Sequence, residues 1–213
     1  MKKLKYVLLG ALISAVVATS VVVPTIAWLS SKSEEVVNTF EGGEITVRID
    51  EAPVDEHGKE KEGERVTANN YKFVAGSVLD KDPTPSIKKG SIESYVFVCV
   101  ENENSDVFSI NINDTAWLKV AETGGKTLYA YSTKVDASKA EQDVVLSPIF
   151  TKVTVSEDLT SEQLNQMKQT SPKQFIKSQA FAIQSEAIEK NTAIDKAVEQ
   201  FAMTGTVTYV DIV

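Results

Sequence analysis

The chain has 213 residues, of which 22 are basic and 30 acidic, so its formal net charge is −8 with histidine neutral. This balance argues against a nucleic-acid partner, because binding to phosphates requires clustered lysine and arginine side chains. The length suits one domain, and the single cysteine, Cys99, excludes an intrachain disulfide.

Residues 1–27 have the pattern of an export signal peptide. Three lysines lie within the first five residues, and residues 6–29 then contain no charged side chain. Small residues stand at the −3 and −1 positions behind the helix-breaking Pro24, so we predict cleavage between Ala27 and Trp28. The alternative is an uncleaved membrane anchor, because the apolar run exceeds the roughly 20 residues that span a bilayer.

The mature chain is predicted to begin with an extension, residues 28–43, followed by a β-sandwich domain, residues 44–213. Within the extension, Val36, Val37 and Phe40 form a short β-prone run behind a polar lead. An exposed strand of this kind can add to the edge of another subunit's sheet, so these residues are the candidate donor strand. The alternative is that the run pairs within its own domain.

The first half of the domain has a clear strand pattern. Alternating apolar and polar residues predict a half-buried strand at residues 45–49, and the charged residues 50–65 predict a solvated loop or hairpin tip. Prolines within residues 81–85 predict a sheet edge or a connection, not a central strand, because proline donates no ladder hydrogen bond. The apolar run at residues 93–101 predicts a strand buried on both faces, with Cys99 in the core.

Short strand-like segments separated by Gly, Asn and Pro turns fill the middle of the chain. They lie at residues 107–112, 116–120, 126–131, 144–146 and 149–155. Repeated short strands of this kind are typical of a jelly-roll-like antiparallel β-sandwich.

One or two short helices are predicted within this mainly β pattern. Residues 160–163 read as a capping box that begins a short helix, and residues 192–203 carry an apolar stripe at helical spacing. A buried strand is predicted between them at residues 180–183, and a closing strand at residues 206–212.

No recognised catalytic or metal-binding pattern occurs in the sequence. The only histidine, His57, lies in a hydrophilic loop, which is a poor place for a catalytic base or a zinc ligand. Polar turns at residues 102–106 and 111–114 lack the spacing of a calcium-binding loop. We therefore predict no catalytic residue, no metal site and no cofactor.

Several blocks of the chain resemble the TasA/camelysin family, whose members carry a leader processed by a SipW-type signal peptidase. The blocks are residues 27–31 and 37–47 at the start, residues 81–84 and 94–96 further on, and residues 179–184 with the helix that follows. At residues 29–31 the chain reads Leu-Ser-Ser where the family usually has Phe-Ser/Thr-Asp. The resemblance implies a jelly-roll-like β-sandwich with helices inserted at one side, and fibres assembled by strand donation from the mature N-terminus.

From this resemblance we expect a secreted, non-enzymatic structural protein that forms or decorates extracellular biofilm matrix fibres of a Gram-positive-type bacterium. The expected partners are further copies of the chain, other matrix or cell-surface proteins, and the SipW-type signal peptidase. Two alternatives stay open. One is a camelysin-like cell-surface metallopeptidase with a metal held by carboxylates and His57, and the other is a membrane-anchored adhesin that keeps its leader helix.

Overall fold

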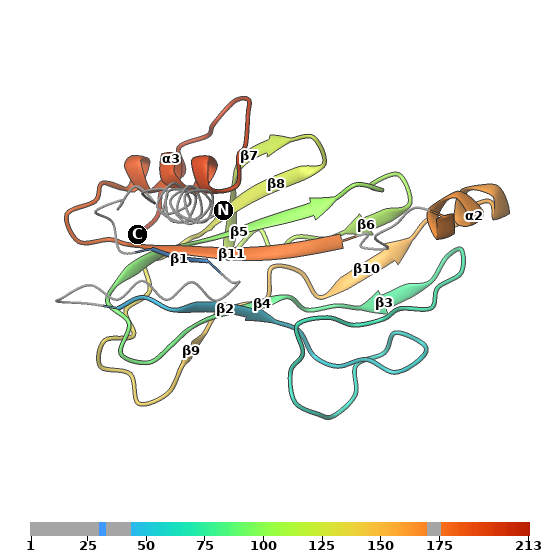
Figure 1. The fold of residues 1–213 in the computed structure, drawn as a ribbon, viewed down its shortest axis with the longest axis horizontal. Helices are drawn as coiled ribbons and strands as arrows, with labels where there is room; N and C mark the ends of the chain where they lie inside the picture. The colour runs from blue at the N-terminus through green and yellow to red at the C-terminus, as the bar shows by residue number, and fades with distance from the viewer. Residues whose placement is uncertain (1–29, 33–43, 170–175) are drawn as a thin grey trace, which may run out of the picture.

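The computed structural model describes residues 30–32, 44–169 and 176–213. In this part of the chain the protein is mainly β, with three antiparallel sheets and two short helices (Figure 1). The predicted mainly β class, with antiparallel strands and short inserted helices, is confirmed at this level.

The largest sheet has five strands in the order β1-β11-β5-β8-β7. Their bounds are β1 (Ser30–Lys32), β11 (Ile176–Gln184), β5 (Ser94–Asn102), β8 (Lys126–Tyr131) and β7 (Trp117–Thr123). The central pair is β5 and β11, which run antiparallel and match all nine residues, from Ile176 opposite Asn102 to Gln184 opposite Ser94.

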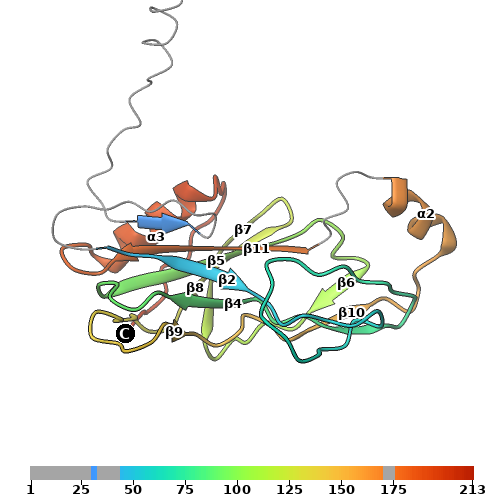
Figure 2. The same ribbon diagram turned by 60° about the horizontal axis from the view of Figure 1, so that its bottom comes forward.

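Two three-stranded sheets complete the β structure. One has the order β3 (Val78–Asp80), β10 (Lys152–Val155) and β6 (Phe108–Ile110), and the other β2 (Val47–Asp50), β4 (Thr84–Ile87) and β9 (Val144–Val145). Both lie on one side of β5 and β11, whereas helix α3 (Lys190–Gln200) lies on the opposite side (Figure 2). The five-stranded sheet is therefore covered on both faces.

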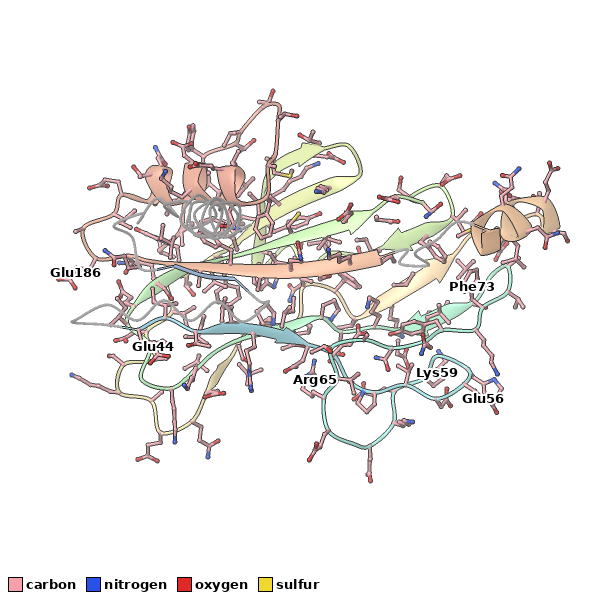
Figure 3. All side chains as sticks on the ribbon, in the orientation of Figure 1. Glu44, Glu56, Lys59, Arg65, Phe73 and Glu186 are labelled. Atoms are coloured by element: carbon pink, nitrogen blue, oxygen red, sulfur yellow. The ribbon has the colours of Figure 1, made fainter. Side chains whose placement is uncertain are left out.

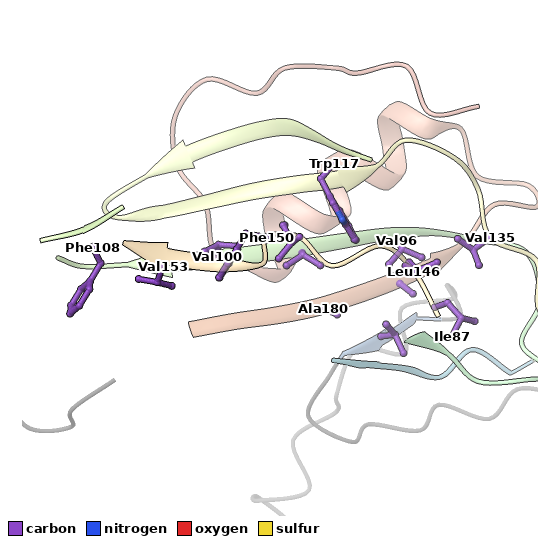
Figure 4. Packing of buried hydrophobic residues seen from close by; sticks show 14 of the residues in the cluster. Ile87, Val96, Val100, Phe108, Trp117, Val135, Leu146, Phe150, Val153 and Ala180 are labelled. Carbon is purple, nitrogen blue, oxygen red and sulfur yellow. The ribbon is translucent and has the colours of Figure 1, made fainter. Parts of the chain in front are cut away.

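Two hydrophobic cores result from this layering, and β5 contributes to both. Val96, Val98 and Val100 belong to the core between the sheets, part of which is drawn in Figure 4. Phe97 and Cys99 point the other way, into the core beneath α3. The predicted burial of this strand on both faces, and of Cys99 in the core, is confirmed.

Both predicted helices are present. Helix α2 (Ser161–Gln169) begins with a reciprocal capping box, in which Thr160 N donates to Gln163 Oε1 at 2.9 Å and Gln163 N donates to Thr160 Oγ1 at 3.2 Å. These two bonds satisfy backbone donors that a helix start leaves open. Helix α3 buries Ala193, Ile194 and Ala197 against the second core.

The prediction that the prolines of residues 81–85 avoid a central strand is wrong for Pro85. This residue lies in β4, the middle strand of its sheet, opposite Ile49 of β2. The ladder to β9 contains only Ser86 and Ile87, while the Pro85 carbonyl accepts a bond from Leu146 N at 2.9 Å. Because the ladder between β4 and β9 does not extend to Pro85, the missing N–H of this residue leaves no gap in it.

The predicted closing strand at residues 206–212 is also wrong, because this segment forms only an isolated bridge between Val207 and Ala121. A regular strand would bury every second side chain. Here Val207 and Val210 are half-buried and Ile212 is buried, so the burial pattern is not that of a strand. The segment runs irregularly beside β7.

Candidate functional site

The outer edge of β11 is the most distinctive backbone feature of the described chain. On this side β1 pairs only with residues Phe181, Ala182 and Ile183. Beyond them, residues 176–179 have no strand neighbour on the outer side within the described residues. An edge of this kind can accept an added strand, because its backbone groups are directed outwards.

A groove with a volume of about 870 Å³ lies directly against this open edge. One wall is formed by residues 176–179 of β11, and the other by residues 49–51 and 67–71. Phe108 and Val153, both buried members of the core between the sheets, line it as well. An apolar side chain that enters this groove would therefore reach the hydrophobic core.

Ser178 places a hydroxyl group beside the groove. It lies opposite Val100 on the face of the sheet that is directed to the first core. Its Oγ is buried and has no hydrogen-bond partner among the described residues. Buried polar groups are nearly always paired, so this hydroxyl favours an occupant that can accept or donate a hydrogen bond.

The wall opposite β11 is a loop fastened by polar contacts. Glu51 and Val66 exchange backbone hydrogen bonds of 2.8 Å each, which closes the predicted hairpin tip at its base. Asn69 holds the same loop from inside, because its Nδ2 donates to Ala52 O at 2.8 Å and its Oδ1 accepts from Val54 N at 3.1 Å. This wall is thus a fixed part of the groove.

Arg65, labelled in Figure 3, links the loop to the last residue of β2, Asp50, and to Asp82, which lies shortly before β4. Its guanidinium binds the Asp50 carboxylate through Nε, donates to Asp82 Oδ2 at 2.9 Å through Nη1, and donates to the carbonyls of both residues at 3.0 Å. Partial burial alone would lower the pKa of Arg65, but the hydrogen bonds to Asp50 and Asp82 outweigh it and raise this pKa. The charges of Asp50 and Asp82 are therefore balanced by the Arg65 guanidinium, which these contacts hold in place.

A buried ion pair stands inside the groove. The Lys81 ammonium binds the Glu51 carboxylate, and Glu51 is only 4% exposed. Lys81 Nζ also lies 5.7 Å from the ring centroid of Tyr71, whose hydroxyl donates to Asp80 O at 3.0 Å. Burial raises the pKa of Tyr71 well above its usual value, and the Glu51 charge adds to this rise.

The predicted cleavage site, Ala27 and Trp28, and the predicted donor residues, Val36, Val37 and Phe40, lie outside the described residues. The described part of the extension is β1, and it pairs with β11 of the same chain. Neither helix of the described chain is long and apolar enough to cross a membrane.

No catalytic constellation is found in the described part of the chain. No group of three or more His, Cys, Asp or Glu side chains there is placed to hold a metal ion. The His57 side chain is 79% exposed, and its nearest carboxylate is that of Glu56, at 3.9 Å.

The sequence does not indicate the roles of the groove residues Glu51, Tyr71, Lys81 and Ser178, nor that of Arg65, which holds the neighbouring loop. The charged residues of the loop read as a solvated surface, because the sequence does not show that Glu51 faces Lys81. The one available signal was the serine that alternates with Ile176, Ala180 and Ala182, since a lone hydroxyl on a core face needs a partner.

No family model, curated protein or solved structure matches this chain.

Proposed function

We propose that this chain is a secreted, non-enzymatic structural protein whose copies join into extracellular fibres. The observation that carries the proposal is the edge at residues 176–179, which has no strand neighbour in the described part of the chain and lies against a groove that reaches the core. In the proposal, the donor residues Val36, Val37 and Phe40 of one copy enter this groove on the next copy, while β1 stays paired with β11 of its own chain. A head-to-tail contact produces an open filament when the rotation between neighbouring copies does not close into a ring, and the proposal takes this form.

The register of β1 on β11 indicates how an incoming strand fits. An antiparallel strand that continued this register would place Val37 opposite Ile176 and Glu35 opposite Ser178. Residues directly opposite each other share a face, so both donor side chains would be directed into the groove. Full burial of one valine contributes about 1.5–3 kcal/mol. The Glu35 carboxylate would accept a hydrogen bond from the Ser178 hydroxyl, which offsets part of the cost of removing this charge from water.

The finer features of the proposal rest on the resemblance to the TasA/camelysin family. The three sheets are proposed to form a jelly-roll-like sandwich, and a SipW-type signal peptidase is proposed to cut between Ala27 and Trp28. Cleavage frees the extension at the surface of a Gram-positive-type bacterium, where other matrix or cell-surface proteins are further partners. An Ala27→Asp variant should accumulate as the precursor, because a charged side chain does not fit the small −1 position.

A single donor substitution tests the proposal. Val37→Asp in the mature chain should abolish fibres in negative-stain micrographs, because the carboxylate would be buried without a partner. The circular dichroism spectrum should not change, because in this proposal residue 37 contributes to the contact between copies and not to the sheets of its own copy. Val145→Asp is the matched control, because Val145 is 67% exposed on β9, away from the groove residues. Fibres that persist in Val37→Asp, or that are equally lost in Val145→Asp, would contradict the proposal.

A further inference from the structure

The five-stranded sheet has a second edge at β7, on the side opposite to β11. Residues 204–213 run along this edge: Thr208 N donates to Val120 O at 2.7 Å, and Val207 forms a bridge with Ala121. An uncovered edge strand is a template for pairing with another chain. We propose that this segment, called the strap below, closes the β7 edge against strand pairing with a second copy of this chain.

Apolar anchors hold the strap to the domain at several points. Ile212 is buried in the core beneath α3, and Val207 and Val210 pack against the same core. At the far end, Val213 N donates to Ser132 O at 3.1 Å and Lys134 N donates to Val213 O at 2.7 Å. The strap is therefore bound on both sides of its contact with Val120.

Surface contacts to α3 fasten the strap a second time. Lys190 pairs with Asp211, and the Tyr209 hydroxyl donates to Asp195 Oδ1 at 2.8 Å. These contacts are exposed, so their loss loosens the strap without opening the core. They offer a way to weaken the strap that does not threaten the fold.

The start of the strap lies so close to β7 that a side chain there would be crowded. Gly205 has φ +126°, and a Cβ at this position would lie 3.3 Å from Thr123 Oγ1. The ladder between β7 and β8 also shifts register between Lys119 and Ala121, which bends the edge. A bend and a covering segment are two known means of blunting an edge strand.

The strap makes the two edges of the sheet unequal. Among the described residues, the outer edge of β11 has no strand neighbour along residues 176–179, whereas β7 is covered at Val120 and Ala121. A molecule with one accepting edge adds partners in one direction only. This inference does not require that the β11 groove is used for assembly.

The test opens the β7 edge and reports contact across it. Thr208→Pro removes the N–H that binds Val120 O, and Thr208→Val is the matched control because it keeps this N–H. Glu122→Cys, at an exposed position on β7, reports edge contact by disulfide formation, and Lys72→Cys serves as a remote reporter. All variants carry Ile176→Arg, so that strand donation into the β11 groove does not contribute.

Thr208→Pro should give about ten-fold more dimer linked through the Glu122 position than Thr208→Val, because two copies recover backbone hydrogen bonds across β7. The double variant Lys190→Ala/Tyr209→Phe should also give more of this dimer than Thr208→Val. If Thr208→Pro loses its β-sheet circular dichroism, the double variant alone tests the proposal. Monomers in both opened variants would overturn the proposal. Equal cross-linking at the Lys72 position would overturn it as well.

Discussion

Lys81→Met should destabilise the protein far more than the loss of an ordinary surface charge. The substitution keeps most of the side-chain volume but removes the ammonium group that binds the Glu51 carboxylate. Glu51 is 4% exposed, and the Lys81 side chain is 15% exposed, so water does not replace the lost partner. The variant therefore leaves a buried carboxylate without a counter-charge.

The expected loss is about 3–5 kcal/mol of unfolding free energy, which is typical when one partner of a buried ion pair is removed. For a domain of this size that corresponds to a fall in Tm of about 6–20 °C. Removal of both charges in Glu51→Gln/Lys81→Met should restore most of the stability, because no unpaired charge is then buried.

Urea unfolding followed by circular dichroism measures these differences, and the double-mutant cycle isolates the coupling between the two side chains. Arg48→Met is the matched control, since Arg48 pairs with Asp143 at 3.6 Å and its side chain is 65% exposed. This control should cost about 0–1 kcal/mol. A loss in Lys81→Met no larger than that of Arg48→Met would refute the reasoning.

Three smaller predictions concern single side chains. Because the pKa of Tyr71 is raised in the folded state, Tyr71 stabilises the fold at pH values below the usual tyrosine pKa of about 10, and this stabilisation is lost as the pH rises further. In urea unfolding between pH 8 and 11, the free energy of unfolding should therefore depend less on pH in Tyr71→Phe than in the unsubstituted protein. Ala202 follows α3 with φ +50°, and Met203 N donates to Val198 O, so Ala202→Gly should raise Tm through a gain of about 0.5–1 kcal/mol. Thr160→Ala breaks the capping box of α2 and should cost about 1 kcal/mol, read as faster amide hydrogen exchange in residues 161–169.

The sequence predicts those parts of the fold that depend on local pattern. Six consecutive residues of β5, residues 95–100, have an apolar pattern that only burial on both faces explains, and the structure places them between two cores. The capping box at Thr160 and Gln163 is equally local, because both partners lie within one helical turn.

The misses come from contacts between distant segments. Pro85 is tolerated in a central strand because β9 pairs only with Ser86 and Ile87, which no local pattern reveals. Residues 206–212 have the composition of a strand, but contacts with α3 and β7 hold them in an irregular path.

The groove was beyond sequence reasoning for the same reason. Its walls come from residues about 110 positions apart along the chain, at 67–71 and 176–179. The sequence places the candidate donor strand in the extension but does not show where it binds. The exposed edge of β11 becomes visible only when β1 is seen to cover three of its residues.

Mixing two assembly-defective variants tests strand donation most directly. Val37→Asp damages the donor and keeps the groove, whereas Ile176→Arg blocks the groove, which Ile176 lines, and keeps the donor. Each variant alone should stay monomeric in light scattering after size-exclusion chromatography. An equimolar mixture should give a one-to-one dimer and no longer species. The intact donor of Ile176→Arg can enter the intact groove of Val37→Asp, and no other donor and groove in the mixture can pair. Fibres in the mixture, or no complex between two folded variants, would contradict head-to-tail strand donation into this groove.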